Sequence, residues 1–282
     1  MENMTRRFGF WVDESTSKVP PHPTESKELL YNRIIINAIR GVLKAQGLRI
    51  YIHGAENIPA EGGALLAINH TGYYDFILGG VPALLRGKRL VRFMAKKEIF
   101  DTPVVGALMR GMHHASVDRA HGAGSLDDAI NRLRNGQLVG IFPEATVSRS
   151  FEIKGLKTGA VRIAAAAEVP LIPLIIWGGQ RIITKDIERN LGRSRTPIII
   201  SVGKPVDPTG EPEAATARLH EAMVTLLDAV RSEYEREFGP FAGGEPWRPA
   251  SLGGGAPDLE RAGLLEIAER ERRQAKKAKR RK

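Results

Sequence analysis

The chain of 282 residues, with 42% hydrophobic and 26% charged residues, is long enough to bury a substantial core, which excludes a disordered or fibrous protein. The absence of cysteine excludes disulfides, thiol nucleophiles and zinc sites built on thiolates, and is compatible with a reducing compartment. The net charge of +10 is uneven: residues 270–282 hold nine Lys or Arg and one Glu, a charge of +8 that leaves +2 for residues 1–269.

Residues 1–48 are predicted to form an irregular lead-in to about residue 23 and then one amphipathic helix. Thr24 is expected to cap this helix and Gly47 to end it. Its apolar residues cover a wide arc opposite a polar stripe of Arg33, Asn37, Arg40 and Lys44. Such a helix either packs on the domain with a solvated face or lies in a membrane interface, and the pattern leaves both open.

Short aliphatic and β-branched runs alternate with helical patterns from residue 49 to about residue 240. Strands are expected at 48–54, 63–69, 90–96, 113–118, 137–142, 170–176 and 197–203. Helices are expected at 74–86, 103–111, 125–135, 157–167 and 211–238. This alternation predicts an α/β domain over 49–240 with a mostly parallel sheet flanked by helices.

Residues 241–282 are predicted to form a Gly/Pro linker and a basic tail, in which 257–282 has a helical pattern. Each Lys or Arg near an anionic membrane contributes about 1 kcal/mol of attraction, and nucleic acid attracts such a tail too. No aromatic residues lie between the charges and no RNA-binding block is present. We therefore favour a membrane surface over nucleic acid, with a merely solubilising tail as the alternative.

Apolar stretches are too short for a transmembrane helix. The longest, VPLIPLIIWGG at 169–179, falls below the roughly 18 residues that a spanning helix needs and contains two prolines. The first residues, MENMTRRFGFWVDE, lack the apolar region of a secretory signal. We expect neither a membrane-spanning segment nor a secretory signal.

The segment NHTGYYDF at 69–76 follows the predicted strand 63–69 and holds His70 and Asp75. Ligands of α/β sheets gather at the carboxyl ends of strands, so His70 is a candidate site residue. A tight turn would return the Asp75 carboxylate to one imidazole nitrogen and leave the other to accept a proton. By spacing alone this pattern is weak, and a polar turn with no catalytic role is the favoured interpretation.

Two further strand ends carry residues suited to an anionic substrate. The segment IFPEATVSRS places Glu144, Thr146 and Arg149 after one strand, and HHASVDR places Arg119 after another. The planar guanidinium group matches phosphate. Lys96, at the end of the strand 90–96, either contacts phosphate or CoA or is a solvated surface charge. A base beside an anion site indicates a phosphorylated alcohol as the substrate.

Other kinds of site have little support. No G-x-S-x-G motif follows a strand, so a covalent serine mechanism is not indicated. His113 and His114 are adjacent, and in a strand they would point to opposite faces and could not bind one metal ion. We expect no metal site.

Four ordered blocks, NHTGYYD, SVDR, FPEAT and VPLIP, resemble those of the glycerolipid acyltransferases, specifically the 1-acylglycerol-3-phosphate acyltransferase group. MAKKEIF at 94–100 and LKTGAVRIA at 156–164 also look like connecting segments of that family. The resemblance covers about residues 50–205 and implies the glycerol-3-phosphate acyltransferase-like α/β fold.

The resemblance also implies a reaction: transfer of an acyl group from acyl-CoA or an acyl carrier protein to a free hydroxyl of a lysophospholipid, most simply 1-acylglycerol-3-phosphate. His70 would deprotonate the hydroxyl, Asp75 would orient His70, and Arg119 would hold the phosphate. Glu144 and Thr146 would place the acceptor, and Pro170 and Pro173 would shape the acyl region. No cofactor is implied, and the enzyme would be peripheral on the cytoplasmic face of the cell membrane.

The chain departs from the family pattern in two blocks. His113 and Ser116 stand where the second block usually has Gly and an aromatic residue, and Ala145 and Val147 replace the Gly and Arg of the third. One phosphate-binding cation is therefore missing, and Arg149 is either its replacement or a surface residue. The departures motivate an alternative, a non-catalytic membrane or RNA-binding adaptor on the same fold; a hydrolase that uses water as the acceptor is a third interpretation.

Overall fold

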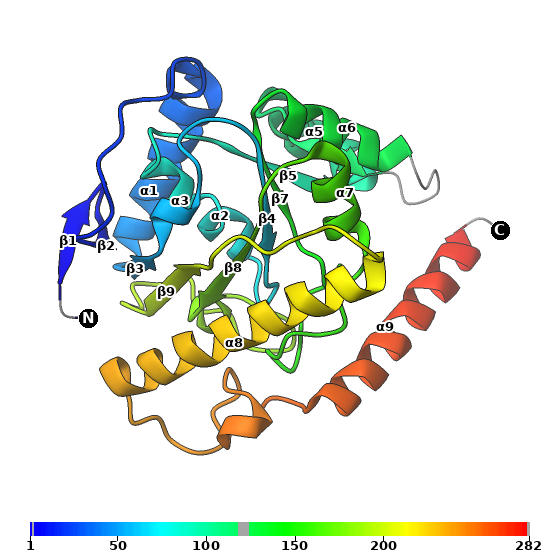
Figure 1. Ribbon diagram of the computed structural model, residues 1–282. Helices are drawn as coiled ribbons and strands as arrows, with labels where there is room; N and C mark the ends of the chain where they lie inside the picture. Colours follow the sequence, from blue (N-terminus) through cyan, green and yellow to red (C-terminus); the bar gives the residue numbers. More distant parts are fainter. Residues whose placement is uncertain (2, 118–123, 281–282) are drawn as a thin grey trace.

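The computed structural model describes residues 1, 3–117 and 124–280. Within them, nine strands form one sheet in the order β1-β2-β3-β9-β8-β4-β7-β5-β6. The strands are β1 Met4–Arg7, β2 Phe10–Asp13, β3 Arg49–His53, β4 Ala64–Ile68, β5 Val91–Lys96, β6 Ala115–Val117, β7 Leu138–Ile141, β8 Leu171–Trp177 and β9 Pro197–Val202. The α-helices are α1 Ile36–Ala45, α2 Asp75–Leu78, α3 Val81–Leu84, α4 Lys97–Phe100, α5 Pro103–Gly111, α6 Gly124–Arg134, α7 Gly159–Ala167, α8 Pro212–Phe238 and α9 Leu259–Arg280 (Figure 1).

The sheet is mostly parallel, which confirms the predicted fold class. Only β1 with β2 and β8 with β9 pair antiparallel within the described residues. The parallel strands β8, β4, β7, β5 and β6 therefore place their carboxyl ends at one edge. The segments that follow β4, β7 and β8 lie next to one another at this edge.

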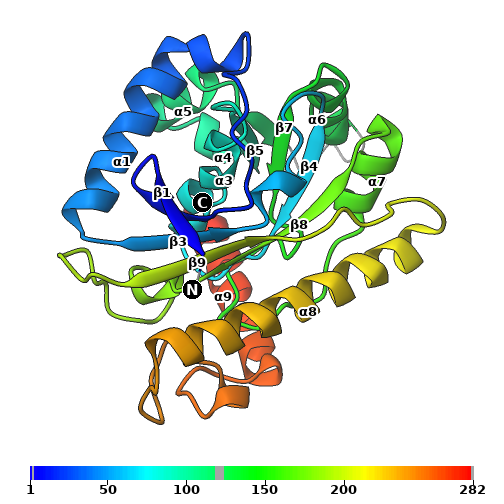
Figure 2. The same ribbon diagram turned by 60° about the vertical axis from the view of Figure 1, so that its left-hand side comes forward.

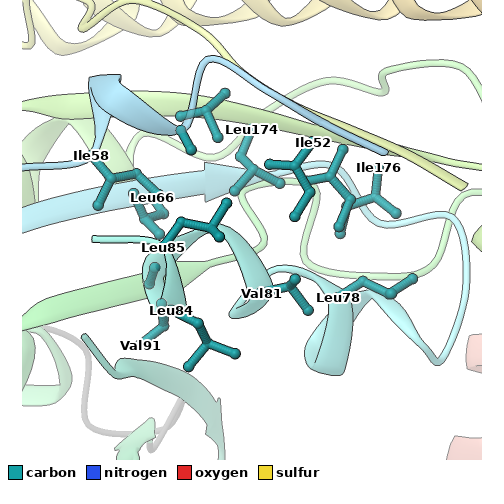
Figure 3. Packing of buried hydrophobic residues seen from close by; sticks show 14 of the residues in the cluster. Ile52, Ile58, Leu66, Leu78, Val81, Leu84, Leu85, Val91, Leu174 and Ile176 are labelled. Carbon is teal, nitrogen blue, oxygen red and sulfur yellow. The ribbon is translucent and has the colours of Figure 1, made fainter. Parts of the chain in front are cut away.

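Helices cover both faces of the sheet, because its central strands are apolar on both sides. In β4, Leu66 and Ile68 join the core on the α3 side, while Leu65 and Ala67 join the core on the α7 and α8 side. Figure 3 shows the first of these cores, where Leu66 of β4 and Leu174 of β8 face Leu85, which directly follows α3. Burial on both faces requires continuous rather than alternating hydrophobicity, as the sequence of β4 shows.

The strands from β3 to β9 lie within two residues of their predicted bounds, and so do helices α5, α6, α7 and α8. The single helix predicted at 74–86 is wrong, because it is divided into α2 and α3. Pro82 has no N–H to donate to the carbonyl of Leu78, which ends the regular pattern. At the division, Gly79 packs so closely on Ile68 that a Cβ would lie 2.7 Å from its Cδ1.

The continuous N-terminal helix is also wrong. A 3₁₀ turn, η1 Glu25–Lys27, is followed by an extended Glu28, a π-helical segment η2 Leu29–Ile35 and then α1. Thr24 makes no cap with its side chain, and its hydroxyl lies 3.3 Å from His22 Nδ1. The chain breaks here because the carboxylates of Glu25 and Glu28 bind Arg89 and Arg92 of a distant segment.

The irregular lead-in predicted for residues 1–23 contains a hairpin, β1–β2. The second strand pairs parallel with β3, where Trp11 lies opposite Tyr51. Arg40 of α1 holds the turn by donating to the carbonyl of Phe8 at 2.9 and 3.1 Å. The hairpin thus extends the sheet; the domain boundaries at 48 and 240 stay a prediction.

The C-terminal segment folds back on the domain through α9, which Figure 2 shows in red. Its carboxylates pair with basic residues of the loops after β7 and β8. None of the helices in the described part of the chain has the length and apolar character needed to cross a membrane.

Candidate active site

His70 and Asp75 form a close pair at the carboxyl end of β4. His70 Nδ1 lies 3.1 Å from Asp75 Oδ2, and the Asp75 side chain is fully buried while the imidazole is partly exposed. Because the carboxylate accepts, Nδ1 carries the proton of this bond, and Nε2 on the other side of the ring is the nitrogen that can accept one. The arrangement is that of a general base and the carboxylate that orients it.

The backbone of the turn holds Asp75 in place. The N–H groups of Thr71 and Gly72 donate to Asp75 Oδ2 at 2.6 and 2.7 Å. Gly72 is required at its position, because a Cβ there would lie 2.9 Å from the carbonyl oxygen of Ile183. The carboxylate therefore organises its own turn as well as the imidazole.

The residues flanking His70 fix the position of its ring. Asn69 closes the pairing of β4 with β8 by bonding both the carbonyl and the N–H of Ile176, at 3.0 and 2.7 Å. The imidazole stacks on Phe142, with ring centroids 4.3 Å apart. Phe142 directly follows β7, so two neighbouring strands determine where the base lies.

Glu144 is a buried carboxyl group that binds the backbone of His70. Its Oε1 accepts from the N–H of His70 at 2.8 Å, and its Oε2 accepts from the N–H of Lys154 at 3.3 Å. Burial is the largest influence and raises the pKa of Glu144 to about 8, although these hydrogen bonds and the Lys154 charge act in the opposite direction. Glu144 therefore connects the backbone of the base to that of Lys154, a structural role that the sequence did not predict.

The segment after Glu144 folds tightly against the base. Ala145 has a positive φ of 64°, which suits the glycine usual at this position in the resembling family. The N–H of Ser148 donates to the carbonyl of His70 at 2.7 Å. Arg149 is nine-tenths buried, with Nε 2.5 Å from Asp186 Oδ2 and Nη2 3.0 Å from Glu269 Oε2, and is thus not a free surface arginine.

The structure therefore brings His70, Asp75, Glu144 and the segment carrying Thr146 and Arg149 together. Lys96 ends β5, which β7 separates from β4, and its substrate-binding role stays a prediction. Arg119 lies outside the described residues. The roles of the other predicted site residues in binding substrate also stay predictions.

Three further residues from the sequence analysis, Val147, Pro170 and Pro173, can be located in the structure. Val147, which stands where the resembling family has an arginine, is buried in the fold. Pro170 lies just before β8 and Pro173 is buried within it, and their predicted role in shaping the acyl region stays a prediction.

His113 and His114 have opposite environments. His113 is exposed, whereas His114 is buried and accepts from the N–H of Phe93 at 3.0 Å. Burial, with the charge of Arg92, lowers the pKa of His114 to about 3, so this ring is a neutral core acceptor.

Lys154 and Lys185 are two basic residues at this edge that sequence analysis missed. Lys154 Nζ lies 2.6 Å from Thr146 Oγ1, and Lys185 belongs to the loop after β8. The hydroxyl of Thr184 donates to the carbonyl of Thr71 at 2.6 Å, which ties that loop to the turn after His70. The available signal was the presence of lysines in the segments that follow two strands, Lys154 and Lys157 after β7 and Lys185 after β8, which is too common to identify a site.

Comparison with known proteins gives the class to which this geometry belongs. A family model described as Acyltransferase matches residues 49–177. A 1-acyl-sn-glycerol-3-phosphate acyltransferase of Bacillus subtilis is 36% identical over 143 residues, which are 50% of this chain and 69% of that protein. The chain therefore belongs to the acyltransferase family, and within it to the 1-acyl-sn-glycerol-3-phosphate acyltransferase group.

More distant relatives agree with this assignment. A chloroplastic 1-acyl-sn-glycerol-3-phosphate acyltransferase of Arabidopsis thaliana is 28% identical over 54% of this chain, which spans only 42% of that protein. The crystal structure of the 1-acyl-sn-glycerophosphate acyltransferase of Thermotoga maritima covers 69% of this chain and 80% of its own, with a TM-score of 0.54 and 23% identity. The likeness to the Thermotoga maritima structure shows a shared fold.

Proposed function

We propose that the chain transfers a fatty acyl group from an acyl thioester to the free hydroxyl of 1-acylglycerol-3-phosphate, which yields phosphatidic acid. The observation that carries this function is the 3.1 Å contact between His70 Nδ1 and the buried Asp75, at the strand end where the family match also falls. Bacterial and plant relatives that bear this activity in their names support the choice of acceptor.

The reaction follows from the two functions of the pair. His70 Nε2 takes the proton from the acceptor hydroxyl as its oxygen attacks the thioester carbonyl, and Asp75 stabilises the imidazolium that forms. The tetrahedral intermediate then breaks its carbon–sulfur bond, and the departing thiolate takes the proton from His70. An ester and a free thiol are the products, and the enzyme returns to its initial state.

A direct transfer without an acyl-enzyme agrees with the residues around the base. The chain has no cysteine. Ser148 and Ser150 are buried and bonded to each other at 3.1 Å, and Ser148 also donates to the carbonyl of Glu152. Such serines are held by the fold and are poorly placed to act as nucleophiles.

The donor is acyl-CoA or acyl carrier protein, and the acceptor reaches the site from a membrane surface on its cytoplasmic side. Exposed apolar side chains support this peripheral association. They include Leu29 and Ile34 of η2, Val104 and Val105 of α5, and Leu264 and Ile267 of α9. Amphipathic helices with basic residues bind the boundary between headgroups and acyl chains in this way.

Lipid product analysis of the purified full-length chain tests the function. The chain is incubated with palmitoyl-CoA or palmitoyl-acyl carrier protein and, in separate reactions, 1-acylglycerol-3-phosphate, lysophosphatidylcholine, monoacylglycerol or no acceptor. We expect phosphatidic acid to form fastest and free thiol to appear in equal amount. Thiol release with fatty acid as the only lipid product would indicate a hydrolase, and no thioester consumption with any acceptor or donor would favour the adaptor; either result contradicts the proposal.

A further inference from the structure

Three basic side chains converge beside the turn that holds His70. Arg149 and Lys154 come from the segment after β7, and Lys185 comes from the loop after β8. Each of these segments bonds the 70–73 backbone or its supporting carboxyl group: Ser148 N to His70 O at 2.7 Å, Lys154 N to Glu144, and Tyr73 N to Ile183 O at 3.1 Å. The backbone segments that carry the three cations are therefore held close to the base.

Two carboxylates of α9 occupy this cluster. Glu266 Oε1 lies 2.7 Å from Lys154 Nζ, and its Oε2 accepts from the hydroxyl of Thr146 at 3.2 Å. Glu269 Oε2 lies 3.0 Å from Arg149 Nη2 and 3.1 Å from Lys185 Nζ. The two glutamates are one helical turn apart and present their oxygens on one face of α9.

The cluster has the charge and donors of a phosphate site. With Asp186 on Arg149, the three cations leave a net charge of +2 once the α9 carboxylates are set aside. A phosphate monoester carries about −1.5 to −2 at pH 7 and accepts through three oxygens. Arg149 Nη1 is buried and has no hydrogen-bond partner among the described residues, so a donor remains for a further oxygen.

The electrostatics at Glu269 agree with an anion site. Burial would by itself raise the pKa of Glu269, but the hydrogen bonds from Lys185 and Arg149 lower it to about 2. Positive charge is therefore concentrated where the carboxylate lies. The glutamates are also 25% and 27% exposed, and such ion pairs are individually weak and exchangeable.

We propose, building on the acyltransferase function above, that Arg149, Lys154 and Lys185 bind the phosphate monoester of the acceptor, and that Glu266 and Glu269 of α9 occupy this site when no acceptor is bound. Lys154 and Lys185 then supply the positive charge that Val147 does not. α9 acts as an internal competitor, joined to the domain by the linker that follows α8. Acceptors with a terminal phosphate displace α9, because the phosphate replaces its two carboxylates on the three cations. Neutral acceptors form no such ion pairs and therefore do not displace α9.

Steady-state kinetics of full-length variants test the competition. Glu266→Gln/Glu269→Gln removes two charges from the cluster. Glu260→Gln/Glu271→Gln is the matched control, because it removes two charges from exposed positions of the same helix. We expect the KM for 1-acylglycerol-3-phosphate to fall about three- to tenfold in the first variant and to stay at the wild-type value in the control. An unchanged or higher KM in the first variant would overturn the proposal.

A variant of Lys154 tests whether this residue binds the phosphate or only holds α9 in place. In the Glu266→Gln/Glu269→Gln background, Lys154→Gln should raise the KM for 1-acylglycerol-3-phosphate about tenfold and leave that for monoacylglycerol unchanged, and Lys154→Arg should restore the first value. If Lys154 only fastened α9, Lys154→Gln would not raise the KM in this background, which would contradict its role as a ligand.

A binding measurement that needs no turnover distinguishes failure of the site from failure of the proposed reaction. Glycerol 3-phosphate is titrated calorimetrically into wild type, the Glu266→Gln/Glu269→Gln variant and the control. We expect tighter binding in the variant alone, and loss of that gain when Lys154→Gln is added. Equal affinity in all proteins would refute the anion site even if acyl transfer were observed.

Discussion

Two clusters of ion pairs tie the ends of the chain to the same domain, and they are built differently. At the N-terminal end, Arg89 is fully buried and donates to Glu25 and to the carbonyls of Pro59 and Gly62. At the C-terminal end, the carboxylates of Glu266 and Glu269 are partly exposed and meet Lys154, Arg149 and Lys185.

The difference indicates which contacts are permanent. The Glu25–Arg89 pair excludes water, and the guanidinium is surrounded by backbone carbonyl oxygens that cannot leave, so Arg89 has no exchangeable partner. The C-terminal pairs involve side chains of a helix on a linker, beside the proposed catalytic base, and water or a phosphate can replace either carboxylate. Buried charge here stabilises the fold, whereas accessible charge is available for function.

The largest expected effect lies in the N-terminal cluster. Glu25→Gln leaves the buried Arg89 without its counter-charge and weakens the bond from the N–H of Leu90 to Glu25 Oε2. We expect the free energy of unfolding to fall by about 3–5 kcal/mol. Urea unfolding followed by circular dichroism measures this; a loss below about 1 kcal/mol would show that the two clusters do not differ in kind.

A pH-dependent effect of intermediate size comes from His53, which joins the N-terminal hairpin to β3. Its Nδ1 lies 2.8 Å from Asp13 and its Nε2 lies 3.3 Å from Glu233. Burial would lower the pKa of His53, but the two carboxylates raise it to about 9.

Since the folded pKa exceeds the ordinary value of 6.5, the stabilisation is complete below pH 6.5 and is lost as the pH rises through 9. We expect a His53→Gln variant to be less stable than wild type by about 2 kcal/mol at pH 6, and the difference to shrink by pH 10. Unfolding curves at both pH values check this. A constant difference would mean that the histidine charge contributes nothing.

The smallest effect is expected in the C-terminal cluster. Glu269→Gln removes the partner of Lys185 and one partner of Arg149, yet these pairs are partly exposed and Asp186 remains on Arg149. We expect a stability loss of about 1 kcal/mol or less, measured in the same urea experiment as Glu25→Gln. A loss as large as that of Glu25→Gln would make α9 a structural element rather than an exchangeable cover.

Ionic strength should also affect the C-terminal cluster more than the N-terminal cluster. Raising salt from 0.1 M to 1 M shortens the Debye length from about 10 Å to about 3 Å and screens exposed charges far more than buried ones. Amide hydrogen exchange should therefore speed up a few-fold in α9 and remain unchanged around Arg89. Equal responses in the two regions would contradict the comparison.

The sequence was sufficient for the parts of the molecule that depend on local patterns. The strands from β3 to β9 are apolar runs with clear ends, and His70 and Asp75 are five residues apart on one strand-to-helix turn. Local patterns therefore predicted the strands and the contact between His70 and Asp75, whereas their proposed catalytic role came from the resemblance to the acyltransferase family.

Contacts between distant residues could not be predicted in this way. Lys154 and Glu266 are 112 residues apart, and nothing in either segment specifies the other. The break at Glu28 and the capping failure at Thr24 likewise follow from Arg89 and Arg92, which tertiary packing brings to this segment. The hairpin of residues 4–13 gains its order from pairing with β3, which its own strands of four residues each do not reveal.

The most direct test of the central claim is the turnover of His70→Ala with 1-acylglycerol-3-phosphate and palmitoyl-CoA, measured on protein whose circular dichroism and urea midpoint match those of wild type. Loss of the general base should lower kcat by about 10²- to 10⁴-fold, with acceptor binding largely retained. A folded variant that still forms phosphatidic acid at nearly the wild-type rate would show that His70 is not the base.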